Sequence, residues 1–178
     1  MNRRQFLFTG AALTAVATNS MSARSYSAIG GANDRLRLGV IGLGRRATEV
    51  CKGFAEDPRL QIVALADIYD KQAADFQAAL KDHMERPTVL VEYQQMLENK
   101  DVDAVFIATP DHLHVQMAKD ALDAGKHVYL EKPTLHRWSE RDALVQAAAG
   151  SMAILQCGMQ QRSGAHYMRA KQEIFDTH

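Results

Sequence analysis

The sequence predicts an α/β protein with a doubly wound parallel sheet, the Rossmann architecture. Short apolar segments of strand length alternate with amphipathic helical segments, a pattern typical of parallel strands joined by right-handed crossovers. The first strand-like segment leads directly into a glycine-rich turn at residues 42–47. Polar or reactive residues also follow several strand-like segments, at the strand ends where such sheets bind ligands.

Each expected element has its own local signal. The expected strands are apolar runs, and residues 62–66 form a continuous one, as a strand covered on both faces should. The expected helices carry apolar residues three or four positions apart. Gly125 is expected to end one helix, and Ser139 to cap the start of the next. We expect strands at residues 36–41, 62–66, 88–91, 104–108, 127–130 and 153–158, and helices at residues 45–55, 69–84, 93–98, 114–124 and 139–149.

Composition excludes several classes of function. The 178 residues are 47% hydrophobic and 24% charged, as in an ordinary globular domain. The 21 basic residues are balanced by 21 acidic ones, so we expect no nucleic-acid partner. The glycine turn lacks the Lys-Ser/Thr pair of a P-loop nucleotide triphosphatase. Cys51 and Cys157 have no metal-ligand spacing, so we predict no metal site and interpret both as small core residues.

Residues 1–33 are predicted to be a targeting segment rather than part of the fold. Arg3 and Arg4 precede Phe6 and Leu7, and a mildly apolar run follows at residues 8–17. This order is typical of a bacterial twin-arginine signal peptide. The apolar run is about a dozen residues, short of the roughly 18 that span a membrane, so we expect no stable membrane anchor. The interpretation predicts a periplasmic or secreted protein whose dinucleotide-binding domain occupies residues 34–157.

The glycine turn predicts a dinucleotide site. Gly42 allows the tight turn, Gly44 lets the backbone approach a pyrophosphate, and Ala47 lets the following helix pack close to the strand. Unpaired N–H groups at the start of that helix would then face the phosphates. The predicted position of the turn, between a strand and a helix, makes the prediction much stronger than the motif alone.

Asp67, at the end of the second expected strand, predicts NAD as the cofactor. A carboxylate there can accept hydrogen bonds from the adenosine ribose hydroxyls and would repel the 2′-phosphate of NADP. Arg45 and Arg46 leave NADP possible, because a guanidinium at the turn could pair with that phosphate instead. Both arginines could equally be a solvated helix start.

Two further strand ends carry candidate residues. Thr109 and Pro110 close the fourth strand, and His114 could donate a hydrogen bond to cofactor or substrate, or simply begin a helix. Lys132 ends the fifth strand between Glu131 and Pro133, near the expected position of a nicotinamide ring. A lysine there could orient a substrate hydroxyl and relay its proton, so Lys132 is the predicted catalytic residue.

Together these segments resemble the Gfo/Idh/MocA family of oxidoreductases, from about residue 34 to residue 178. The resemblance rests on residues 40–44, 64–67, 103–110 and 124–133, together with His114. It implies a dehydrogenase acting on a sugar or polyol hydroxyl, with Glu131 and Pro133 flanking the nicotinamide and Lys132 touching substrate. It also implies a cis peptide bond before Pro133, and it brings Arg162 and Tyr167 toward the ligand.

Residues 158–178 resemble the start of the family's second, α+β domain, which carries the substrate pocket and the oligomer interface. Family members are much longer, so we expect this chain to be a fragment that binds the dinucleotide without turnover, and the full-length protein to be a homo-oligomer. Two alternatives remain: a glycosidase of the same family that uses bound NAD transiently, and a dinucleotide-binding module without catalysis.

Overall fold

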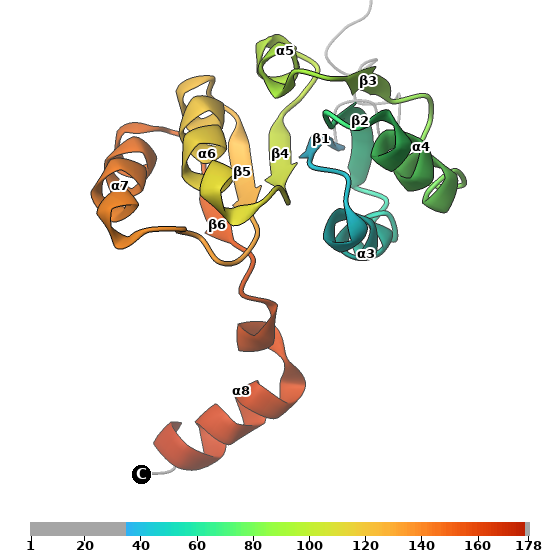
Figure 1. Cartoon of the computed structure of the whole chain (residues 1–178). Helices are drawn as coiled ribbons and strands as arrows, with labels where there is room; N and C mark the ends of the chain where they lie inside the picture. The colour runs from blue at the N-terminus through green and yellow to red at the C-terminus, as the bar shows by residue number, and fades with distance from the viewer. Residues whose placement is uncertain (1–34, 177–178) are drawn as a thin grey trace, which may run out of the picture. The chain divides into compact units, whose positions relative to one another are not determined.

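The computed structural model describes residues 35–176, and these contain one parallel six-stranded sheet (Figure 1). The strand order is β3-β2-β1-β4-β5-β6, and every neighbouring pair runs parallel. This is the order of a dinucleotide-binding sheet, whose winding reverses between β1 and β4. The strands are β1 Leu36–Ile41, β2 Leu60–Ala66, β3 Thr88–Leu90, β4 Ala104–Ile107, β5 His127–Leu130 and β6 Leu155–Cys157.

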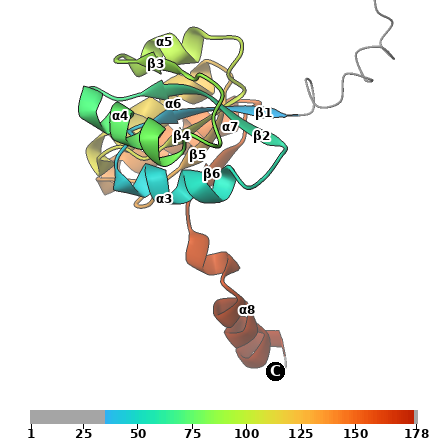
Figure 2. The same cartoon turned by 90° about the vertical axis from the view of Figure 1, so that its right-hand side faces the viewer.

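Helices cover both faces of the sheet, which confirms the predicted doubly wound fold. Two helices, α3 and α4, lie on one face, and α5, α6 and α7 lie on the other (Figure 2). A further helix, α8, follows β6. The bounds are α3 Arg45–Phe54, α4 Asp70–Ala79, α5 Tyr93–Glu98, α6 His114–Asp123, α7 Arg141–Gly150 and α8 Ala165–Lys171.

The central strand β4 shows how the two faces are filled. All four of its residues are buried. Val105 and Ile107 belong to the apolar cluster beneath α5, α6 and α7, whereas Ala104 and Phe106 belong to the cluster beneath α3 and α4. Alternate side chains of a strand point to opposite faces, so a strand buried on both sides reads as one continuous apolar run. The sheet therefore separates two cores.

The amino ends of the strands are joined by charged side chains. Arg37 at the start of β1 pairs with Asp103, which precedes β4, with Nη2 2.8 Å from Oδ1. The guanidinium hydrogen bonds hold the pKa of Asp103 below its ordinary value. Beside them the Lys126 ammonium donates to the carbonyl oxygens of Asn99 and Val102, and burial lowers its pKa. These contacts join β1, the segment before β4 and the segment before β5.

Several expected boundaries differ from the structure. Helix α4 ends at Ala79 rather than near residue 84, because Leu80 leaves the helical conformation, with φ −123° and ψ 17°. Ser139 does not cap α7; it lies in a 3₁₀ turn, Trp138–Glu140, that precedes the helix. Cys51 is buried as expected, but Cys157 on the edge strand is only half-buried.

The predicted leader, residues 1–33, lies outside the described residues. Within the described part of the chain, no helix is long and apolar enough to cross a membrane.

Candidate functional site at the carboxyl ends of the strands

The carboxyl ends of β1, β4 and β5 lie side by side and bring three predicted segments together. The N–H of Ala108 donates to the Ile41 carbonyl at 2.9 Å, and the N–H of Glu131 donates to the Ile107 carbonyl at 3.0 Å. The glycine turn, the segment after β4 and the Lys132 segment are therefore neighbours. They meet where the winding of the sheet reverses, which is the ligand-binding crevice of open α/β sheets.

Gly42 makes the tight turn that the sequence predicted. Its φ of +83° lies in the left-handed region. A Cβ there would lie 2.8 Å from Thr109 Cγ2 and 2.9 Å from the Thr109 backbone nitrogen, too close for any side chain. The N–H of Gly42 donates to the Ala66 carbonyl at 2.9 Å. Only glycine fits this position, for reasons of both conformation and space.

The start of α3 has room for a phosphate group. Gly44 is its N-cap residue, in an extended conformation and without a side-chain capping hydrogen bond. A Cβ on Gly44 would meet no atom within 4 Å. The first-turn N–H groups of a helix have no partners within it and carry the positive end of its dipole. Ala47 is fully buried against the sheet, as close helix packing requires. This arrangement fits the pyrophosphate of a dinucleotide.

Asp67 anchors the glycine turn and remains able to accept further hydrogen bonds. Its Oδ2 accepts from the Leu43 N–H at 2.7 Å and its Oδ1 from the Tyr69 N–H at 2.9 Å. A carboxylate has about four lone-pair positions, so two are still available. The half-buried Asp67 side chain can therefore hold the turn and bind a ribose hydroxyl at the same time.

The two arginines of the turn lie in different environments. The Arg45 side chain is 93% exposed, with Nε 3.7 Å from Oε1 of Glu49. Arg46 instead directs its guanidinium to the buried Glu131 carboxylate: Nε and Nη2 lie 2.8 and 2.7 Å from Oε1. Arg46 is thus already paired with a carboxylate, which leaves Arg45 as the exposed guanidinium of the turn.

Glu131 connects the turn to Lys132. Its side chain is 3% exposed, and its Oε2 accepts from the Lys132 N–H at 3.0 Å. Burial and the nearby Glu131 charge raise the pKa of Tyr129, with Arg46 opposing. We expected Glu131 to lie at the cofactor, and in the structure its two carboxylate oxygens bind Arg46 and the Lys132 N–H. No sequence pattern indicated this ion pair, because its partners come from distant segments.

His114 is buried at the start of α6. The sequence left two roles open, a hydrogen bond to cofactor or substrate and the start of a helix, and the ring is 1% exposed. Its Nδ1 lies 2.7 Å from the Pro133 carbonyl oxygen and its Nε2 lies 2.9 Å from the Thr109 carbonyl oxygen. Both ring nitrogens are occupied by backbone, so His114 joins two loops and does not face an open site.

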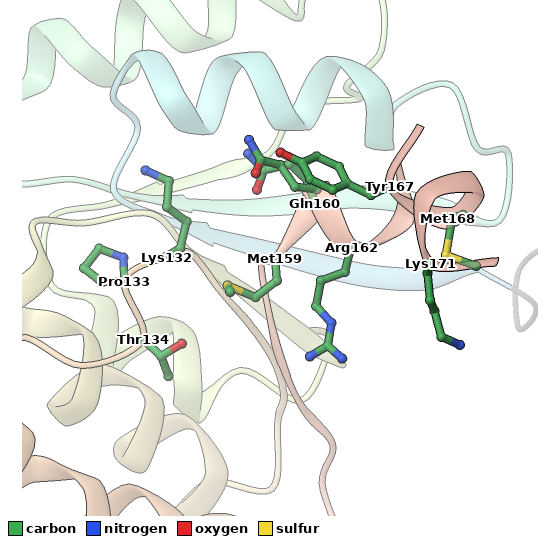
Figure 3. Close-up of a pocket in the computed structure, with 10 residues that line it drawn as sticks. Lys132, Pro133, Thr134, Met159, Gln160, Arg162, Tyr167, Met168 and Lys171 are labelled. Carbon is green, nitrogen blue, oxygen red and sulfur yellow. The ribbon is translucent and has the colours of Figure 1, made fainter. Parts of the chain in front are cut away.

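Lys132 borders a cavity of about 960 Å³ (Figure 3). The peptide bond between Lys132 and Pro133 is cis, as the resemblance implied. Arg162 and Tyr167, the expected substrate residues, line the same cavity, although the charged ends of Lys132 and Arg162 point in different directions. The remaining lining residues are Pro133, Thr134, Met159, Gln160, Gln161, Met168 and Lys171. Lys171, one helical turn after Tyr167, is a residue that helical spacing could have identified.

The other expected cofactor residues lie at the rim of this sheet edge. Thr109 is half-buried beside Gly42, and Pro110 is exposed at the start of the following loop. Pro133 is exposed next to Lys132. Among residues 35–176, no three His, Cys, Asp or Glu side chains are grouped so as to hold a metal ion.

The chain is similar to known proteins in sequence and in fold. The uncharacterized oxidoreductase YrbE of Bacillus subtilis is 30% identical over 75% of this chain and 38% of its own length. A glycosyl hydrolase family 109 protein of Streptomyces niveus is 37% identical over 62% of this chain and 23% of its own. A solved structure, the WlbA dehydrogenase of Bordetella pertussis in complex with NADH and UDP-GlcNAcA, has a TM-score of 0.72 at 26% identity, covering 80% of this chain and 42% of that one.

The chain thus spans less than half the length of these relatives. A family model matches more than half of the chain. Residues 36–159 match the model described as an oxidoreductase family with an NAD-binding Rossmann fold. The chain therefore belongs to the Gfo/Idh/MocA family of oxidoreductases and carries its NAD-binding domain.

Proposed function

We propose that this chain is the cofactor-binding part of an oxidoreductase that moves hydride between a nicotinamide and a sugar or polyol hydroxyl. The observation that carries the proposal is the position of Lys132, which borders the 960 Å³ cavity at the same sheet edge as the glycine turn. A proton-transfer group, a phosphate-sized opening and a cavity for substrate then lie together. The NADH and UDP-GlcNAcA of the Bordetella pertussis structure support a carbohydrate substrate.

The residues present fit NAD. The backbone from Gly42 to Ala47 would hold the pyrophosphate, and Asp67 would accept from the adenosine ribose. Thr109, Pro110 and Pro133 would border the nicotinamide half. Bound NAD would supply a hydride acceptor, which none of the side chains named here can provide.

Lys132 would bind the substrate hydroxyl and accept its proton. Its side chain is exposed to the cavity, so its ammonium can donate to a substrate hydroxyl, and its neutral amine can take that hydroxyl's proton as hydride leaves the carbon. Arg162 and Tyr167 line the cavity and would orient the other hydroxyl groups. Because the chain spans less than half of its relatives, turnover is proposed for the longer protein and dinucleotide binding for this chain.

The site favours NAD over NADP. A 2′-phosphate would meet the Asp67 carboxylate, and Arg46 is already paired with Glu131. Calorimetric titration should give one NAD site per chain and weaker binding of NADP. Asp67→Asn keeps an oxygen for the Leu43 N–H but removes the charge, so the preference for NAD should fall about tenfold or more. Asp70→Asn, an exposed neighbour, is the matched control. Absence of NAD binding by the folded wild-type chain contradicts the proposal.

A glycosidase using the same site is the second candidate. It is favoured by the Streptomyces niveus relative, a glycosyl hydrolase family 109 protein. Such a reaction returns the hydride to the substrate, so a longer protein containing this chain would cleave a glycoside with no accumulation of NADH. Following NADH absorbance and glycoside cleavage together separates the two candidates: NADH formed in step with product indicates the dehydrogenase.

We also propose export through the twin-arginine route, from Arg3, Arg4 and the short apolar run that follows them. A reporter fused after residue 33 should reach the periplasm of a bacterium with an active twin-arginine system. Replacing Arg3 and Arg4 with lysine should keep the reporter in the cytoplasm. Unchanged export of the lysine variant contradicts this interpretation.

A further inference from the structure

Lys132 is held by buried polar contacts on both sides, and neither contact was expected from the sequence. The first is the Glu131 carboxylate. One of its oxygens, Oε1, binds Arg46, while the other accepts from the Lys132 N–H at 3.0 Å. Gly158 packs against it: a Cβ there would lie 3.3 Å from Oε1. A carboxylate this buried requires a partner, because an unpaired buried charge is strongly destabilising.

The second contact comes from His114. Its two ring nitrogens lie at hydrogen-bonding distance from the carbonyl oxygens of Pro133 and Thr109. A neutral imidazole has one N–H, so it can donate to one carbonyl at a time, whereas a doubly protonated ring donates to both. The ring therefore lies between the carbonyl of the residue after Lys132 and the carbonyl of Thr109, just past the end of β4.

The two contacts approach from opposite faces of the sheet. Arg46 belongs to α3, which lies on one face, and His114 begins α6, which lies on the other (Figure 2). The first fixes the backbone nitrogen of Lys132, and the second fixes the carbonyl of the next residue. Between these two points the Lys132 side chain remains exposed at the cavity.

We propose that Arg46, Glu131 and His114 are positioning residues that together hold the Lys132 backbone at the cofactor edge. This inference rests on the proposed function, since it assigns Lys132 a place beside the nicotinamide half of NAD. Because Arg46 also lies in the first turn of α3, which follows the glycine turn, the same ion pair links the phosphate-binding turn to the lysine segment. Reactive groups need such support, since a displacement of about 1 Å can reduce a rate about 100-fold.

The test measures how well NAD shields Lys132. The purified chain is acylated with an amine-reactive reagent, with and without saturating NAD, and the rate at Lys132 is read by mass spectrometry against that at the half-exposed Lys119. In the wild-type chain NAD should slow the modification of Lys132 at least about tenfold relative to Lys119. ADP-ribose, which lacks the nicotinamide, should protect much less.

Two variants loosen the lysine without leaving a buried charge unpaired. The double variant Arg46→Met with Glu131→Gln removes both charges of the ion pair. On the other face, His114→Asn replaces the ring with a shorter side chain and so weakens that contact. Each should still bind ADP-ribose, and with NAD at saturation the protection of Lys132 should fall at least about fivefold. Arg59→Ala breaks an exposed Arg–Asp pair before β2, and His83→Asn changes an exposed histidine; both controls should keep full protection.

The outcomes separate the two proposals. Full NAD protection of Lys132 in both variants overturns the positioning role and leaves the proposed function intact. Binding of NAD to the wild-type chain without any protection of Lys132 overturns both the positioning role and the catalytic assignment of Lys132. If the double variant loses ADP-ribose binding, Glu131→Gln alone replaces it, because its single amide oxygen cannot accept from Arg46 and from the Lys132 N–H as the two carboxylate oxygens do; unchanged protection in that variant counts against the positioning role as well.

Discussion

Two arginine–carboxylate pairs lie at opposite edges of the sheet. Their nitrogen–oxygen distances are similar, but they have different roles. At the amino ends of the strands, Arg37 binds Asp103 with two nitrogens on two oxygens, at 2.8 and 3.0 Å, and both side chains are about a third exposed. At the carboxyl ends, Arg46 places two nitrogens on one oxygen of Glu131, which is 3% exposed. The second oxygen is thereby left for the Lys132 N–H.

The difference shows that distance alone does not identify a functional ion pair. The Arg37 pair joins two strands and is exposed enough for water to replace it. The Arg46 pair is desolvated on the carboxylate side, and it connects a ligand-binding turn to a reactive lysine. The two pairs differ in the burial of the carboxylate and in the group that its second oxygen binds. Matched substitutions at the two edges should therefore give different results.

Removing Arg46 should have the largest effect on stability. Arg46→Ala leaves the Glu131 carboxylate buried without its partner, so the free energy of unfolding should fall by about 3 kcal/mol. Arg37→Ala, the matched change at the amino edge, leaves Asp103 accessible to water and should cost clearly less. Urea unfolding of both variants measures the two losses. Equal losses would contradict the distinction drawn between the two edges.

A methyl group added at Gly42 should have the next largest effect. Gly42 and Gly125 both have positive φ, +83° and +72°. A Cβ added at Gly125, at the amino edge, would meet nothing within 4 Å, whereas at Gly42 it would lie 2.9 Å from the Thr109 backbone. Gly125→Ala should therefore cost only backbone strain, about 1 kcal/mol, and Gly42→Ala about 2 kcal/mol or more. Thermal unfolding measures the order, and Gly42→Ala should also weaken NAD binding.

The smallest effect concerns acid stability at the amino edge. The pKa of Asp103 is lowered by folding, through its hydrogen bonds with Arg37. Its contribution is therefore complete above the unfolded value of about 3.9 and disappears as the pH falls through the lower folded value. Asp103→Asn should be less stable than wild type at neutral pH, and the gap should narrow below about pH 4. A gap that widens in acid would mean that the paired carboxylate does not stabilise the fold.

Much of the fold could be predicted because its signals are local. The strand at 127–130 and the helix at 93–98 have the expected bounds, since an apolar run and an amphipathic repeat respectively define them. The start of α7 was misplaced because the Glu140 carboxylate accepts from the backbone N–H groups of His136 and Arg137. These bonds stabilise a 3₁₀ turn where Ser139 suggested a cap.

The residues of the site could be predicted from the sequence, but the contacts between them could not. The glycine turn and Lys132 are visible as motifs beside predicted strands. The pairing of Arg46 with Glu131 joins residues from two separate strand ends and leaves no pattern in the sequence. The burial of His114 likewise depends on two carbonyl groups that only the folded chain brings within reach.

Amide chemical shifts test the contrast between the two edges most directly. NAD is titrated into the isotopically labelled chain, and the shift of each backbone amide is followed by NMR. We expect shifts concentrated at Leu43 to Ala47, Asp67 and Glu131 to Lys132, with Arg37 and Lys126 at the amino edge unchanged. Shifts centred on Arg37 and Lys126, or no shifts in the folded chain, would contradict a ligand site at the carboxyl edge.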